Sequence, residues 1–256
     1  MIDKSKRKYV LGYPVDALTH EKTIEIIDRI IAENKTLYQT VINAAKIVKM
    51  RKDKDLEESV VTADLINADG QGVVWASRIL NQPIPERVTG IDLMESLVEL
   101  AFKKKYKIYF FGAKEEVVRA VVEMYSKKYS PDIIAGYRNG YYLLEEEKTI
   151  VKKIGDSGAN ILFVAMTSPK KEIFLKNYRE DLQVNFTMGV GGSFDVVSGK
   201  IKRAPLWMQN IGLEWLFRFL QEPTRLWKRY LVTNFVFIYF VLKAKLFPDK
   251  FKIRKG

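Results

Sequence analysis

Short apolar runs alternate with segments of helical spacing through the first 199 residues of this 256-residue chain. The runs are rich in β-branched and aromatic residues, and they predict strands at 37–42, 107–111, 160–165 and 184–190, with a weaker one at 64–67. Strands that alternate with helices are typical of α/β proteins, in which helices cover both faces of a mostly parallel sheet. The sequence therefore predicts this fold class for the first 199 residues.

One of the intervening segments shows the helical pattern clearly. Ile27, Ile30 and Ile31 place an apolar stripe on a helix that Thr19 is suited to cap. Because ligands of parallel sheets bind beyond the carboxyl ends of the strands, we expect functional residues in the loops that directly follow the strand runs.

The absence of cysteine limits the chemistry of the chain. It excludes disulfides, zinc–thiolate sites and thiol catalysis, and it is compatible with a reducing cytoplasm. The first eight residues are strongly charged and no apolar run follows them, so the sequence predicts no secretory signal.

Residues 205–256 differ from the rest and predict a separate helical appendage. From residue 200 onward the chain holds 13 of its 43 Lys and Arg residues but only 3 of its 31 Asp and Glu residues, so most of the net charge of +12 lies there. The apolar run at 231–242 has 12 residues, whereas a bilayer span needs about 20. We therefore expect that the appendage does not cross a membrane.

Aromatic and basic residues are interleaved in the appendage, as at Trp215, Arg218, Trp227 and Lys228. This pattern favours the anionic surface of a membrane, where aromatic rings lie among the headgroups and basic side chains are attracted. Nucleic acid attracts the same residue types, but the apolar run at 235–242 suits hydrocarbon better, so no nucleic acid partner is expected. Packing on the protein core and self-association through the apolar residues stay open as alternatives.

The loop at 67–72 follows the weak strand run and holds a carboxylate between glycines. Asp69 is suited to take a proton from a hydroxyl group, and Gly70 and Gly72 let the chain approach a substrate closely. The structural alternative is that Asp69 caps the helix that follows.

Two further loops are suited to bind phosphates. Arg87 precedes Thr89, a predicted N-cap, and an arginine beside a helix N-terminus makes a diphosphate clamp; a plain surface arginine is the alternative. The glycines of segment 189–195 can present backbone amides to phosphates, and Asp195 is suited to hold ribose hydroxyls. A tight turn between a strand and a helix explains the same glycines. The spacing lacks the third glycine of the dinucleotide fingerprint, which disfavours a nicotinamide-dependent enzyme.

Two features that suggest metal binding have simpler explanations. Asp53 and Asp55 form a DxD pair of the kind that holds metal ions in some enzymes, but they lie in a charged stretch that predicts a solvated helix junction. His20 is the only histidine, and its position after Thr19 predicts a helix start. The sequence therefore predicts no metal site.

Taken in order, several segments resemble one family. They are NADGQGVVWAS at 67–77, PERVTGIDLM at 85–94, FFGAKEEV at 110–117, GVGGSFDVVSGKIKRAP at 189–205 and GLEWLFRFLQEPTR at 212–225. The series resembles the WecB/TagA/CpsF glycosyltransferases (glycosyltransferase family 26) over most of the chain.

The resemblance implies a Rossmann-like glycosyltransferase domain at 1–204 and an inverting transfer of a hexose or N-acetylhexosamine, N-acetylmannosamine above all, from a UDP-sugar. The implied acceptor is a polyprenyl-diphosphate-linked sugar, used at the cytoplasmic face of the membrane to build a cell-surface polysaccharide or teichoic acid. UDP-glucose or UDP-galactose, in exopolysaccharide synthesis, is the alternative donor. A non-catalytic membrane- or nucleic-acid-binding protein is the alternative class. Because cationic side chains can neutralise a diphosphate, we expect no cofactor and no obligatory metal.

The resemblance also implies roles for individual residues. Three catalytic residues are implied: Asp69 matches the family's proposed general base, Asn43 a family asparagine at the edge of the pocket, and Arg87 the arginine of the PERVxGxDL motif. The residues expected to bind substrate are Gly70, Gly72, Gly112, Lys171, Gly191, Gly192, Asp195, Arg218 and Arg225.

The chain departs from the family in two segments. Many relatives have Thr-Pro-Asn-Ala where this chain has Val41-Ile42-Asn43-Ala44, so a hydroxyl near the sugar is missing. Many relatives have glutamine where this chain has Lys171, and a cation at that position suits a more acidic ligand. Both departures bear on the identity of the donor or the acceptor.

Overall fold

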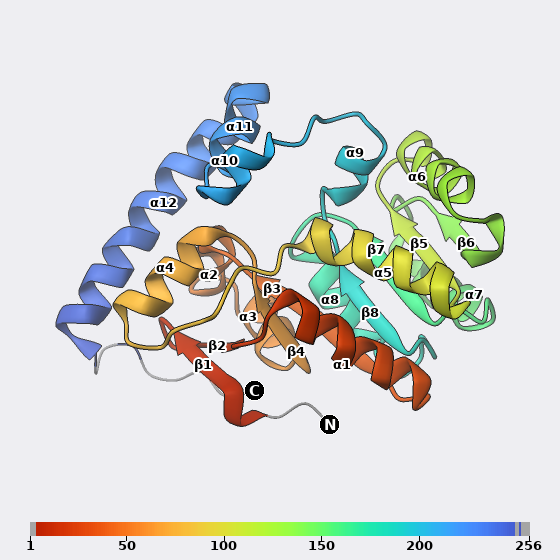
Figure 1. Ribbon diagram of the computed structural model, residues 1–256, viewed down its shortest axis with the longest axis horizontal. Coiled ribbons are helices and arrows are strands. Elements are labelled where there is room, and N and C mark those ends of the chain that lie inside the picture. Colours follow the sequence, from red (N-terminus) through yellow and green to blue (C-terminus); the bar gives the residue numbers. More distant parts are fainter. Residues whose placement is uncertain (1–3, 249–250, 252–256) are drawn as a thin grey trace.

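The computed structural model describes residues 4–248 and 251, except for the side chains of Asn210, Arg225 and residues 228–231. Its centre is a six-stranded parallel sheet of order β4-β3-β8-β7-β5-β6 (Figure 1). The strands are β3 (Leu37–Ile42), β4 (Leu65–Ala68), β5 (Ile108–Gly112), β6 (Ile134–Arg138), β7 (Ile161–Ala165) and β8 (Phe186–Gly189). The five predicted strand runs all form strands of this sheet, and the expectation of a mostly parallel sheet is confirmed.

The structure adds an antiparallel hairpin that the sequence did not predict, formed by β1 (Arg7–Val10) and β2 (Tyr13–Asp16). Polar contacts attach it to the sheet. The Nε atom of Arg7 lies 2.8 Å from Oδ1 of Asp16, and Oδ2 of Asp16 accepts a hydrogen bond from the backbone N–H of Ile66 in β4. Charged residues begin and end this hairpin, so its strands do not stand out as apolar runs.

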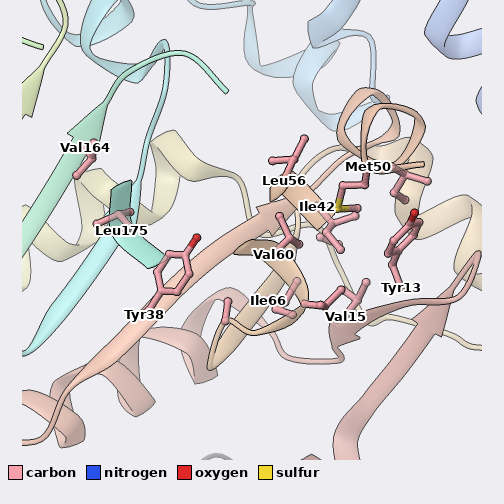
Figure 2. Close-up of a cluster of buried hydrophobic side chains, with 14 of the residues drawn as sticks. Tyr13, Val15, Tyr38, Ile42, Met50, Leu56, Val60, Ile66, Val164 and Leu175 are labelled. Carbon is pink, nitrogen blue, oxygen red and sulfur yellow. The ribbon is translucent and has the colours of Figure 1, made fainter. Parts of the chain in front are cut away.

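Helices cover both faces of the sheet, as predicted. One face carries α1 (His20–Ala32), α5 (Gly90–Lys104), α6 (Glu115–Lys128) and α9 (Ser193–Val197). The other carries α2 (Ala44–Met50), α3 (Lys54–Val61), α4 (Gln71–Ile79), α7 (Glu147–Gly155) and α8 (Lys170–Asn177). Successive residues of β7 alternate between the two apolar clusters, because neighbouring side chains of a strand point to opposite faces. Figure 2 shows part of the second cluster, around Tyr38 and Ile42 of β3.

Three predicted helix starts are confirmed. The side-chain oxygen of Thr19 accepts a hydrogen bond from the backbone N–H of Lys22 at the start of α1, and Thr89 caps α5 in the same way. Asp53, one member of the DxD pair, caps α3 by accepting from the N–H of Leu56 at 3.0 Å. Its carboxylate therefore has a structural role at a helix junction.

Three helices follow the sheet at the C-terminal end: α10 (Leu206–Asn210), α11 (Glu214–Gln221) and α12 (Pro223–Leu246). The longest, α12, runs beside α2 and α4 (Figure 1). Phe237, Val241 and Ala244 of α12 are buried in the apolar cluster of the second sheet face. One side of α12 thus packs on the core, which was one of the alternatives for the appendage.

The opposite side of α12 is exposed and apolar. Its exposed residues are Val232, Phe235, Ile238, Tyr239, Leu242 and Leu246. Of the helices in the described part of the chain, none combines the length and apolar character that crossing a bilayer requires.

Candidate active site

All six strands of the sheet are parallel, so their carboxyl ends lie along one edge. Asn43 follows β3 and Asp69 follows β4, and these two strands are hydrogen-bonded neighbours. The glycine turn at 190–192 follows β8, the other neighbour of β3. The fold therefore brings three of the predicted loops together at the place where parallel sheets bind ligands.

Asp69 and Asn43 are in direct contact. Nδ2 of Asn43 donates to Oδ2 of Asp69 at 3.3 Å, and Oδ1 of Asn43 accepts from the backbone N–H of Lys46, which fixes the amide orientation. The helix after Asp69, α4, begins at Gln71 with Gly70 at its N-cap position, and no side chain caps it. The alternative in which Asp69 is a helix cap is therefore wrong, and its carboxylate is left to act in the site.

Burial is the largest influence on Asp69, and it raises the pKa of this carboxyl group. The hydrogen bond from Asn43 and the charge of Arg218 lower the pKa, while the carboxylate of Glu214 raises it. Lys46 also lowers it, but the pKa stays above its ordinary value. A buried carboxylate with a raised pKa binds a proton more readily, which suits a general base.

Arg87 and Arg218 meet at one carboxylate of the C-terminal helices. Nη1 of Arg87 lies 3.2 Å from Oε2 of Glu214, and Nη2 of Arg218 lies 3.6 Å from Oε1 of the same side chain. The Arg87 and Glu214 side chains are largely buried, so Arg87 is not the plain surface arginine of the alternative interpretation. Since Glu214 and Arg218 both act on the pKa of Asp69, α11 completes the site from the C-terminal end of the chain.

Two buried lysines share one buried glutamate beneath the site. Nζ of Lys46 lies 2.9 Å and Nζ of Lys171 lies 2.7 Å from Oε1 of Glu172. Burial acts to raise the pKa of Glu172, but the two lysines outweigh it and lower the pKa to about 2. The Lys171 side chain runs along the end of β8, because a Cβ atom on Gly189 would lie 3.0 Å from its Cδ. Lys171 therefore belongs to an ion-pair cluster at the junction of β3 and β8.

The predicted glycines are explained by backbone conformation, by close packing, or by both. Gly70 has a φ of +101° with open space around its Cα, and Gly191 has a φ of +54° in the turn after β8, so both allow backbone shapes that other residues resist. Gly112 has both reasons, because its φ is +118° and a Cβ atom there would lie 2.6 Å from the Ala165 carbonyl oxygen. Gly72 faces the ring of Phe237, to which a Cβ would come within 3.9 Å. A substrate role for each of these glycines stays a prediction.

Asp195 and Gly192 lie together at the start of α9, where a Cβ on Gly192 would come within 4.0 Å of Oδ2 of Asp195. Nζ of Lys200 lies 3.9 Å from Oδ1 of Asp195, and the Asp195 side chain is partly exposed. The side chain of Arg225 lies outside the described residues, so the structure does not place that predicted ligand.

Sequence reasoning missed three charged residues of the site. Lys46 lies one helical turn after Asn43, Glu172 directly follows Lys171, and Glu214 precedes Arg218 by four residues. Glu214 and Lys46 were detectable as charges one turn from a predicted site residue on the same helix face. The ion pairs of Lys46 with Glu172 and of Glu214 with Arg87 were not detectable from the sequence.

The described residues hold no group of three or more His, Asp or Glu side chains that could bind a metal ion. His20 begins α1, as predicted, and its Nε2 atom lies 2.9 Å from Oγ of Ser96.

The fold and the site define a class of protein. A half-buried carboxylate at the carboxyl edge of a parallel sheet is suited to accept a proton, and two arginines that share Glu214 are suited to supply positive charge for a phosphate leaving group. These are the groups that an enzyme needs to transfer a residue from a phosphate-activated donor to a hydroxyl.

Comparison with known proteins identifies that enzyme class. The model of the Glycosyl transferase WecG/TagA/CpsF family matches residues 8–251, and the chain belongs to this family. The protein is therefore a glycosyltransferase, and the resemblance noted in its sequence motifs is confirmed.

Two curated relatives share one name, N-acetylglucosaminyldiphosphoundecaprenol N-acetyl-beta-D-mannosaminyltransferase. The one from Bacillus subtilis (strain 168) is 39% identical over 180 residues, which are 70% of this chain and 69% of the relative. The one from Bacillus spizizenii is 34% identical over 199 residues, which are 78% of this chain and 76% of the relative.

Proposed function

We propose that this protein transfers N-acetylmannosamine, with inversion, from a UDP-sugar to an N-acetylglucosaminyl diphosphate carried on a polyprenol. The names of the two Bacillus relatives support both the sugar and the acceptor. The observation that carries the proposal is the half-buried Asp69 carboxylate, which Asn43 holds at 3.3 Å and whose pKa is influenced by Arg218.

In the proposed reaction Asp69 removes the proton of the acceptor hydroxyl as that oxygen attacks the anomeric carbon of the donor. The bond from the anomeric carbon to the UDP oxygen breaks, and UDP leaves with the bonding electrons. One carboxylate and one displacement give inverted configuration, and the sugar acquires oxocarbenium character in the transition state. The raised pKa of Asp69 increases its ability to hold the transferred proton.

Arg87 and Arg218 stabilise the charge that develops on the leaving diphosphate. Both guanidinium groups contact Glu214, so they are already held at one place before any donor binds. The glycine turn at 190–192 faces the same edge of the sheet, and Asp195 is proposed to hold the ribose.

The enzyme is proposed to work as a peripheral protein at the cytoplasmic face of the cell membrane, where a polyprenyl-linked acceptor is found. The exposed apolar side of α12, with Phe235 at 69% and Leu242 at 57% exposure, would enter the headgroup region. Lys243 and Lys245 near the end of α12 add attraction to anionic lipid.

The test is the release of UDP from a panel of UDP-sugars in the presence of a short-chain polyprenyl-diphosphate N-acetylglucosamine. We expect release only with the acceptor present and fastest with UDP-N-acetylmannosamine. Faster turnover with UDP-glucose or UDP-galactose would contradict the proposed donor, and the absence of turnover with every donor would contradict the proposed reaction. The Lys171→Gln variant in the same panel tests whether Lys171 sets the donor preference.

A further inference from the structure

A cavity of about 560 Å³ lies beside the catalytic cluster, between α4 and the segment that leads into α5. It is lined by His20, Gln71, Val74, Arg78, Pro85, Glu86, Arg87 and Asp92. Arg87 belongs to both the cavity and the arginine pair of the site, and Gln71 comes two residues after Asp69. The cavity therefore borders the residues of the candidate active site.

Most of the charged groups of this cavity are already engaged. Oε1 of Glu86 accepts a hydrogen bond from the backbone N–H of His20 at 2.6 Å. Asp92 accepts from the Thr89 hydroxyl and pairs with Arg203.

Burial acts to raise the pKa of Asp92, but these partners outweigh it and lower the pKa. Asp92 is therefore a paired anion. Arg87 pairs with Glu214.

Arg78 is the exception. It lines the cavity, and its guanidinium group makes no ion pair or hydrogen bond with any residue within 4–248 or with 251 whose side chain the structure describes. A cation of this kind, with five N–H donors in a planar fork, matches the oxygens of a phosphate group.

The position of Arg78 along α4 suits one part of a lipid-linked sugar. Gln71, Trp75 and Arg78 fall on one helix face, and Arg78 lies seven residues beyond Gln71, about 10 Å along the axis. If the attacking hydroxyl of the acceptor sugar lies on the side of the ring opposite its anomeric carbon, the anomeric diphosphate points away from Asp69. A sugar whose hydroxyl meets Asp69 would thus extend its diphosphate along α4 towards Arg78.

The surface next to Arg78 is apolar. Trp75 and Ile79 flank it on α4 and are 50% and 46% exposed. The turn between α10 and α11 contacts α4 at the same place, because a Cβ on Gly212 would lie 2.7 Å from Gln71 and 3.5 Å from the Trp75 ring. Ile211 in that turn is itself 52% exposed, so apolar side chains from two segments meet beside the cavity.

We propose that this cavity binds the acceptor, with the acceptor diphosphate on Arg78 and the first isoprene units of its lipid on Trp75 and Ile79. This assignment rests on the proposed function, because it takes the acceptor to be a sugar diphosphate on a polyprenol. In this assignment α4 aligns the acceptor. The amino end of α4 lies beside Asp69, the proposed general base, and the carboxyl end of α4 lies beside the lipid.

The experiment measures the Michaelis constant for a polyprenyl-diphosphate N-acetylglucosamine at saturating donor, in the full-length enzyme and in Arg78→Gln. We expect the acceptor KM to rise about tenfold or more, while the affinity for UDP changes less than twofold. Arg119→Gln is the matched control, because Arg119 is an exposed arginine on α6 that pairs with Glu115. It should leave both quantities unchanged.

A second variant separates the lipid from the diphosphate. Trp75→Ala should raise the KM for an acceptor with several isoprene units and leave the KM unchanged when a short alkyl chain replaces them. Arg78→Gln should raise KM for both acceptors, since both carry the diphosphate. Equal effects of Trp75→Ala on the two acceptors would contradict the placement of the lipid.

The outcomes distinguish this inference from the proposed function. Turnover by the wild-type enzyme with an unchanged acceptor KM in Arg78→Gln overturns the acceptor site alone. Without turnover by the wild type the proposed function fails, and direct binding of a fluorescent polyprenyl-diphosphate sugar then tests the cavity. Equal binding by wild type and Arg78→Gln in that assay would also overturn the acceptor site.

Discussion

The α/β body and the C-terminal helices use their apolar residues differently. In the body, both faces of the sheet are covered, and strands such as β5 and β7 are buried throughout. In α12, Phe237 and Val241 pack on the body while Phe235 and Tyr239 point to solvent. Exposed apolar patches of this kind mark interaction surfaces, so we propose that the exposed side of α12 binds a partner while its buried side packs on the body.

The two regions nevertheless share one active site. The body provides Asp69, Asn43 and Arg87, while α11 provides Glu214 and Arg218. Since an ion pair joins Arg87 to Glu214 across the two regions, contact of the C-terminal helices with a membrane would be linked directly to the catalytic groups.

The largest effect is expected in the body, from Glu172→Gln. This change leaves Lys46 and Lys171 buried without their shared carboxylate, and we expect it to lower the free energy of unfolding at pH 7 by about 3 to 4 kcal/mol. Because the folded pKa of Glu172 is about 2, below its ordinary value of 4.5, the stabilisation is present above pH 4.5 and is lost as pH falls towards 2.

Urea denaturation at several pH values measures this dependence. The stabilities of wild type and Glu172→Gln should converge as the solution is acidified. A constant difference between the two proteins from pH 7 to pH 3 would contradict the account of the cluster.

A matched pair on α12 tests the comparison itself. Phe237→Ala removes a ring that is 5% exposed and packed on the body, so we expect a loss of about 3 kcal/mol in the free energy of unfolding. Phe235→Ala removes a ring that is 69% exposed, and its effect on stability should stay within about 0.5 kcal/mol.

Co-sedimentation with anionic liposomes completes this test. Phe235→Ala should reduce the fraction of protein that sediments, although the protein is fully folded. If it sedimented like the wild type, the exposed side of α12 would serve another partner, such as a second copy of the chain.

A smaller effect is expected from Arg218→Gln on α11. Loss of one cation that faces the leaving diphosphate should lower kcat about tenfold to a hundredfold, or roughly 2 kcal/mol of transition-state stabilisation. Arg218 also lowers the pKa of Asp69, so its loss should move the acid limb of the pH–rate profile to higher pH. An unchanged profile together with an unchanged kcat would place Arg218 outside the site.

No effect is expected from metal removal. In the proposed reaction Arg87 and Arg218, which both contact Glu214, would provide the positive charge that a divalent cation supplies in other enzymes. Turnover in the presence of EDTA should therefore match turnover without it. Loss of activity that manganese restores would show that the arginines do not suffice.

Five of the six strands of the sheet were predictable because they are apolar runs that can be recognised, whereas the edge strand β6 was not, since it is only partly buried and carries Gly136 and Arg138. Asp69 was predictable because it stands beside glycines in the loop after a strand run, and Arg87 because it precedes the helix cap Thr89. The hairpin of β1 and β2 was not predictable, since it is attached by the Arg7–Asp16 pair and by a backbone contact to β4.

The ion pairs of the site were equally hidden, because they join residues far apart in the chain. Arg87 and Glu214 are 127 residues apart, and Lys46 and Glu172 lie on two different helices, α2 and α8. Patterns of spacing in a sequence report on one helix or strand at a time, so such pairings emerge only from the tertiary structure.

The most direct test of the central claim compares the wild-type enzyme with Asp69→Asn in acceptor-dependent UDP release. The substitution keeps the shape of the side chain and removes the proton acceptor. It should not destabilise the protein at neutral pH, because the raised pKa of Asp69 means that the folded state disfavours the ionised carboxylate there. We predict that the variant binds UDP as the wild type does and loses at least about a hundredfold in turnover; undiminished turnover would contradict the assignment of Asp69 as the base.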